Sequence, residues 1–152
     1  MHQPVFFRAG IIQGALPDAM HDQGYRGSIG AILQHAFPEA TIFNPVEAYP
    51  GSLNFDYQTG KHAFFDLMAR AGRADVLVAY LPEASMGTAI EIWNAYNAGH
   101  LVIAISPLAE NWVLKFMAHH ICPDVADFDR FVESGALADL MARHAAGGTA
   151  RP

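Results

Sequence analysis

The sequence predicts an α/β protein with a mostly parallel sheet of about five strands, flanked by helices. Short, nearly continuous apolar segments alternate with longer segments of helical period, which is the order expected of strands joined by helical crossovers. The chain has 152 residues, 52% of them apolar and 16% charged, and this length and composition suit one domain with its own core. We therefore expect a single-domain sandwich of the flavodoxin or Rossmann type.

The first half of the chain contains two predicted strands and two predicted helices. A run of apolar residues marks each strand, Ser28 and Thr59 are the predicted helix caps, and Gly72 is the predicted stop of the second helix. A long loop with two prolines, 44–60, separates the second strand from the second helix. The expected elements are strand 5–12, helix 28–37, strand 41–43 and helix 59–71.

The second half continues the alternation. Ser106 and Pro107 combine a capping residue with a proline at the first helical position, and Gly135 is expected to interrupt the last helix. The expected elements are strand 75–80, helix 87–98, strand 101–105, helix 107–119 and helix 127–144. We expect the domain to span residues 1–144 and residues 145–152 to form a disordered tail.

Parallel topology places the chemistry at one edge of the sheet. The loops after Ile12, Phe43, Tyr80 and Ile105 follow the carboxyl ends of the predicted strands, so they are expected to share one rim. Ligands of such sheets bind at this edge, so the site is expected there.

Charge and composition exclude several classes of protein. The net charge of −6 and the absence of a basic run argue against a nucleic-acid polymer as partner. The single Cys122 suits a reducing cytoplasm, and neither a secretory signal nor a membrane span is predicted. The eight histidines are scattered without a metal-binding spacing, so we expect no metal and no cofactor.

The segment from Tyr80 to Glu91 carries the strongest functional signal. A strand runs into a short turn, and Gly87 opens a helix at the predicted rim. Ser85 and the amides of Gly87 and Thr88 then lie at the positive end of the helix, where they are placed to bind an oxygen-rich group. Glu91 follows one turn later, placed to attack an electron-poor carbon.

This segment resembles the nucleoside 2-deoxyribosyltransferase family and its relatives, the deoxynucleoside 5′-monophosphate N-glycosidases. The resemblance covers roughly residues 4–120 and is strongest in the strand 74–80 and in the Ser-x-Gly-Thr-x-x-Glu run that ends at Glu91. It implies that Glu91 is the nucleophile, that Ser85 binds the 5′ side of the sugar, and that Asp66 assists the base. Breaking an N-glycosidic bond builds positive charge on the sugar, which a carboxylate can trap.

The resemblance implies further contacts, and the first loop departs from it. Gly10 and Gln13 are expected to contact substrate there, but the Gly-Ser-x-Arg-Gly-Gly pattern of the phosphate-specific branch is missing. Arg8 and Arg26 are the nearby cations that could replace its Arg. Asp18 is another candidate for a base or sugar contact in the same loop, and Asp56 and Tyr57 lie in the long loop 44–60, which is placed to cover the base. The remaining expected substrate contacts are Asn44, Asn111 and Lys115.

Association is also expected. The helices that carry Trp93 and Trp112 are expected to bury apolar surface in a homodimer or homotetramer with shared active sites. The expected partner is otherwise a small nucleoside or nucleotide, with no membrane and no nucleic-acid polymer.

Two alternatives remain open at this point. Pro82 to Glu91 is similar to the turn of cytokinin-activating nucleoside monophosphate phosphoribohydrolases, although the glycine pair of that turn is replaced by Glu83-Ala84; an NAD glycohydrolase is a related alternative. The other alternative is a non-catalytic nucleotide-binding module on the same fold.

Overall fold

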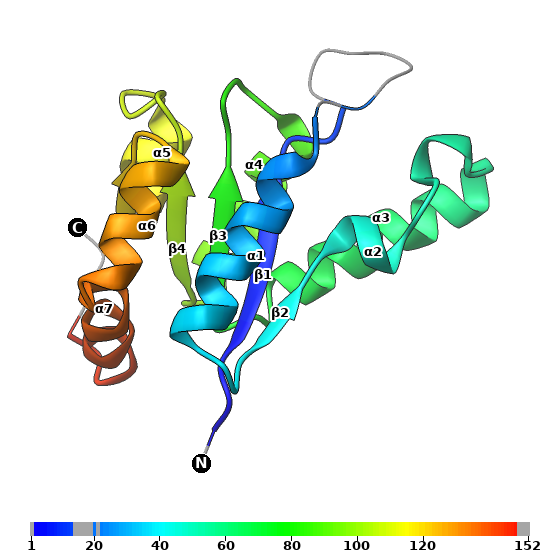
Figure 1. Cartoon of the computed structure of the whole chain (residues 1–152). Helices are drawn as coiled ribbons and strands as arrows, with labels where there is room; N and C mark the ends of the chain where they lie inside the picture. The colour runs from blue at the N-terminus through cyan, green and yellow to red at the C-terminus, as the bar shows by residue number, and fades with distance from the viewer. Residues whose placement is uncertain (1, 14–19, 21, 149–152) are drawn as a thin grey trace.

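Five parallel strands form one sheet in the order β2-β1-β3-β4-β5 (Figure 1) in a computed structural model, which describes residues 2–13, 20 and 22–148. The strands are β1 (Val5–Gly10), β2 (Thr41–Phe43), β3 (Val76–Tyr80), β4 (Leu101–Ile105) and β5 (His120–Cys122). The helices are α1 (Gly24–Ala36), α2 (Pro45–Ala48), the 3-10 turn η1 (Ser52–Asn54), α3 (Tyr57–Ala71), α4 (Met86–Asn97), α5 (Trp112–Met117), α6 (Val125–Glu133) and α7 (Ala136–Ala145).

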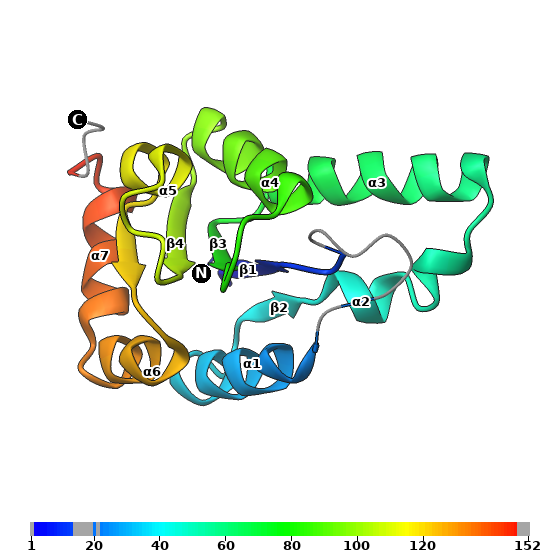
Figure 2. The same cartoon turned by 90° about the horizontal axis from the view of Figure 1, so that it is seen from above.

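Helices cover both faces of the sheet, as the view from above shows (Figure 2). Strand side chains alternate between the two layers: Val76 and Val78 pack with α1, α6 and α7, whereas Leu77 and Ala79 pack with α3, α4 and α5. The predicted α/β sandwich is confirmed. Its strand order is the flavodoxin-like one, in which the order of strands across the sheet reverses between β1 and β3.

The fifth strand was missing from the predicted elements. Helix 107–119 was predicted as one element, but α5 begins only after Asn111, whose side chain accepts a hydrogen bond from the amide of Val113 at 3.0 Å. Ser106 instead donates from Oγ to the carbonyl of Leu81 and accepts from the amide of Leu108, so the predicted helix start at Ser106-Pro107 is wrong. The chain then enters β5 beside β4.

Two other helix starts also differ from the prediction. Helix α1 begins at Gly24, one turn before Ser28, and α3 begins after Asp56, whose carboxylate accepts from the amide of Thr59 at 2.8 Å. The expected long loop 44–60 contains the short elements α2 and η1. The predicted interruption at Gly135 is confirmed, because this residue has a φ of 82° between α6 and α7.

No helix in the described ranges is long and apolar enough to cross a membrane. Residues 149–152 of the predicted tail lie outside the described part of the chain, so its disorder remains a prediction.

Candidate functional site

A cavity of about 370 Å³ opens at the carboxyl edge of β1. The end of β1 and the start of α4 form one side, and α2, η1 and α3 form the other. The predicted site residues that line it are Gly10, Gln13, Ser85, Gly87, Thr88 and Glu91. The edge at which parallel sheets bind ligands is therefore hollowed in this protein.

Glu91 is the buried ionisable group of this cavity. Its side chain lies one turn into α4 and the residue is only 8% exposed. Burial raises the pKa of its carboxyl group to about 8, and the positive charge of Arg26 opposes this shift.

The start of α4 provides polar groups next to Glu91. Ser85 is the N-cap, and its Oγ accepts a hydrogen bond from the amide of Thr88 at 3.3 Å. The other first amides of the helix have no acceptor within the helix, and they carry the positive end of its dipole. A hydroxyl or phosphate oxygen is therefore favoured at this end of the cavity.

Two buried arginines hold the carboxyl end of β1 against α1. Arg26 donates from Nη1 to the carbonyl of Arg8 at 2.8 Å and from Nη2 to the carbonyl of Gly10 at 3.3 Å. Arg8 in turn donates to the carbonyl of Arg26. Neither is among the residues lining the cavity, so the structure places the two expected phosphate cations in backbone contacts. Desolvation lowers the pKa of both arginines, which stay charged as guanidinium groups do.

Asp66 lies on α3 but outside the cavity lining. Its Oδ2 accepts from the hydroxyl of Tyr49 at 2.6 Å and from Nε of Arg70 at 2.8 Å. These hydrogen bonds, that of Tyr49 first, hold the pKa of the Asp66 carboxyl below its usual value, and the same contact raises the pKa of Tyr49. The residue that reaches the cavity is therefore Tyr49.

The other three expected contacts lie away from the cavity. Asn44 is buried and caps α2 by accepting from the amide of Val46 at 3.2 Å. Asn111 lines a neighbouring cavity of about 380 Å³ that shares Ser85 and Met86 with the Glu91 cavity. Lys115 pairs with Glu110 at 2.6 Å on the surface of α5.

Not every sequence candidate enters the cavity or the described structure. Asp18 lies outside the described residues. Asp56 caps α3 rather than lining the cavity, and Tyr57 is 76% exposed. Sequence reasoning also missed the aromatic side of the cavity. Tyr49, Phe55 and Phe64 line it, and the only signal for the first two was the unusual length of the loop 44–60.

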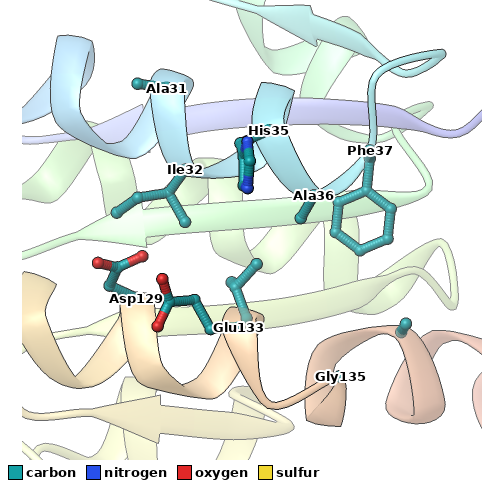
Figure 3. A pocket seen from close by; sticks show the side chains of 10 residues that line it. Ala31, Ile32, His35, Ala36, Phe37, Asp129, Glu133 and Gly135 are labelled. Atoms are coloured by element: carbon teal, nitrogen blue, oxygen red, sulfur yellow. The ribbon is translucent and has the colours of Figure 1, made fainter.

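A larger groove of about 700 Å³ lies between α1 and the α6–α7 pair (Figure 3). His35 projects from α1, and Asp129 and Glu133 project from α6. Within the described ranges, no three His, Cys, Asp or Glu side chains are placed to hold a metal ion.

The fold defines a doubly wound, flavodoxin-like α/β protein with its cavity at the carboxyl edge of the sheet. No protein-family model and no curated protein matches the sequence. The structure is similar to that of a 2-deoxyribosyltransferase from Bacillus psychrosaccharolyticus, with a TM-score of 0.60 and 18% identity over 82% of this chain and 90% of the other. It is also similar to a conserved protein from Enterococcus faecalis, with a TM-score of 0.60 and 18% identity over 88% of this chain and 99% of the other. At this identity the likeness shows a shared fold.

Proposed function

We propose that the protein cleaves or transfers the N-glycosidic bond of a (2-deoxy)nucleoside or its 5′-monophosphate, with Glu91 as the nucleophile. The observation that carries the proposal is a glutamate that is 8% exposed and lines a cavity at the ligand-binding edge of the sheet. Burying an ionisable group opposes folding, so its presence there points to a chemical role. The likeness in fold to a 2-deoxyribosyltransferase supports the same reaction.

In the proposed reaction, ionised Glu91 attacks the anomeric carbon of the sugar. A bond forms between a carboxylate oxygen and this carbon while the carbon–nitrogen bond breaks, and the electron pair leaves with the base, which takes a proton from water. Water then attacks the glycosyl ester and loses its proton to solvent, which releases the sugar and the Glu91 carboxylate. If a ring nitrogen of a second base attacks instead, the ester bond to Glu91 breaks, the attacking base loses its proton to solvent, and the product is a new nucleoside.

The remaining lining residues bind the sugar in this proposal. Ser85 and the amide of Gly87 take the 5′ oxygen or phosphate beside Thr88, since the dipole of α4 favours negative charge there. Gly10 and Gln13 contact the substrate from the end of β1. The proposed setting is the cytoplasm, which suits the free thiol of buried Cys122.

Release of free base is the test. Chromatography would follow a panel of ribonucleosides, deoxynucleosides, their 5′-monophosphates and NAD, each with and without a second base. The variants are Glu91→Ala and the matched control Glu39→Gln, since Glu39 is exposed and precedes β2 at the opposite edge of the sheet.

The outcomes separate the alternatives. Release by the wild type and by Glu39→Gln, with loss in Glu91→Ala, supports the proposal, and dependence on a second base makes the protein a transferase. Equal release by wild type and Glu91→Ala would overturn the role of Glu91. Tight nucleotide binding without release from any substrate would support the binding module.

We also propose a homodimer or homotetramer whose active sites are shared across the α4–α5 face. Trp112 is 77% exposed and Trp93 is 49% exposed, which is a large apolar area to leave in water. The cavity beside α5 borders the Glu91 cavity through Ser85, so a neighbouring subunit on this face would reach the substrate together with Asn111 and Lys115. Light scattering tests this: Trp112→Asp is expected to give a monomer, and a monomeric wild type would contradict it.

A further inference from the structure

The two ends of the Glu91 cavity differ in chemistry. The end toward α4 carries Ser85, Thr88 and Glu91, whereas the end toward α2, η1 and α3 is walled by aromatic and aliphatic side chains. Those that the argument uses are Tyr49, Phe55, Phe64 and Leu67. A ligand that fills the cavity must therefore be polar at one end and apolar at the other.

We propose that the α2–η1–α3 end binds the leaving base and selects a planar base that carries an alkyl or aryl substituent. This inference rests on the proposed function, because the attack by Glu91 fixes the sugar at the α4 end and leaves the opposite end for the base. The fold and the reaction do not require a preference for a substituted base. The preference follows from the side chains that line this cavity.

The aromatic rings give this end its shape. Tyr49 and Phe55 meet edge to face, with ring centroids 6.4 Å apart and planes at 81°. Phe64 lines the cavity from α3 and is 40% exposed, so its ring is available to a ligand. Rings at these positions stack on a planar base and cover an apolar substituent.

The polar atoms of this end are few. Among the described lining residues there, Ser52 and Tyr49 carry the hydroxyl groups, and the hydroxyl of Tyr49 already donates to Asp66 at 2.6 Å. A base with exposed amino and carbonyl groups would lose hydration here and regain few hydrogen bonds, whereas an apolar substituent gains from burial. The cavity therefore favours the substituted base.

Asp66 acts on this end through Tyr49 as a positioning residue. Its Oδ2 accepts from both the Tyr49 hydroxyl and Nε of Arg70, and Asp66 itself lies outside the lining. The carboxylate thus turns the polar end of the Tyr49 side chain away from the ligand and leaves its ring at the cavity wall.

The test compares two substrates, 2′-deoxyadenosine and the same nucleoside with a benzyl group on its 6-amino nitrogen. The readout is the ratio of their kcat/KM values. We expect the wild type to prefer the benzylated substrate by about tenfold or more, and Phe64→Ala to remove most of this preference. Phe65→Leu is the matched control, because Phe65 is the next residue on α3, is 60% exposed and does not line this cavity. Leucine keeps an apolar side chain against the ring of Phe64, which Phe65 meets edge to face at 5.3 Å between ring centroids.

Asp66→Asn, Tyr49→Phe and the double variant test the positioning role. Both single variants should lower the ratio, and the double variant should lower it no further, because the two residues act as one unit. A merely structural role would reduce kcat/KM for both substrates equally and leave the ratio unchanged.

Failure of this inference is distinguishable from failure of the proposed function. Cleavage of both nucleosides with no preference, or an equal loss of preference in Phe64→Ala and Phe65→Leu, would overturn the base selection and leave the glycosidic reaction standing. Calorimetry with the free bases adenine and 6-benzylaminopurine gives a second readout that needs no turnover. Tighter binding of 6-benzylaminopurine, weakened in Phe64→Ala, would support the pocket even if no nucleoside were cleaved.

Discussion

The groove between α1 and α6–α7 has about twice the volume of the cavity that contains Glu91, about 700 Å³ against about 370 Å³. Both contain carboxyl groups. Glu133 in the groove is exposed to water, whereas Glu91 is buried and its pKa is raised to about 8. Volume alone would favour the groove as the candidate functional site. The smaller cavity is favoured because a buried glutamate is energetically costly and because this cavity lies where parallel sheets bind ligands.

Helix α1 acts on both regions. The first turn of α1 provides Arg26, whose charge acts on Glu91, and its last turns provide Ile32 and His35 to the groove. The first turn is tied to the end of β1 by the hydrogen bonds of Arg26. One end of α1 therefore acts electrostatically on the buried Glu91, whereas the other end lines the groove.

The largest expected effect comes from removing one carboxylate from each region. Glu91→Gln keeps the size of the side chain but removes the nucleophile, so kcat should fall by about 10⁴-fold or more. Glu133→Gln should leave kcat within about twofold, since an exposed carboxyl group in the groove does not touch the reacting atoms. Steady-state release of base measures kcat for both variants. A large loss of kcat in Glu133→Gln would instead place the reacting carboxylate in the groove.

The second prediction concerns the pH dependence of the reaction. Because Glu91 must be ionised to attack and its pKa is raised to about 8, kcat/KM should rise about tenfold per pH unit below this value and level off above it. Removing the positive charge with Arg26→Gln should move the rise to higher pH. A flat profile between about pH 6 and pH 9 would contradict the assignment of Glu91 as the titrating nucleophile.

A third prediction concerns stability. The Glu91 pKa is about 8 in the folded protein and near its ordinary value of 4.5 in the unfolded chain, so the folded state binds more protons in this range. The free energy of unfolding therefore falls as pH rises from 4.5 to about 8, by up to a few kcal/mol. Glutamine does not ionise, so the free energy of unfolding of Glu91→Gln lacks this pH dependence. Thermal unfolding should show the variant gaining stability relative to the wild type from pH 4.5 to about 8, with a constant difference above that.

The smallest effect separates two faces of α1. A Cβ added to Gly30 would overlap the guanidinium group of Arg8, whereas one added to Gly27 would meet nothing within 4 Å. Gly30→Ala should therefore destabilise the fold by about 1–3 kcal/mol, and Gly27→Ala should stabilise it by up to about 1 kcal/mol. Denaturant unfolding measures the free energy of unfolding of the two variants. Equal values for Gly30→Ala and Gly27→Ala would contradict this prediction.

The layers and the Glu91 position follow from sequence because they depend on local pattern. The apolar runs of β3 and β4 and the turn before Gly87 predict the start of α4 to within one residue, and the parallel topology places Glu91 near the carboxyl edge. Contacts between distant segments leave no such pattern. The Tyr49–Asp66 hydrogen bond joins residues 17 positions apart, and neither neighbourhood indicates the other.

Both tryptophans of the chain, Trp93 and Trp112, lie on the α4–α5 face and away from the Glu91 cavity. Intrinsic tryptophan emission is thus a reporter of that face and of anything that covers it. A ligand entering beside Tyr49 and Phe55 would leave the emission spectrum nearly unchanged, whereas dilution of an associated form would shift it to longer wavelength. Fluorescence titrations of substrate therefore need a tryptophan introduced at the cavity, and Phe64→Trp provides one.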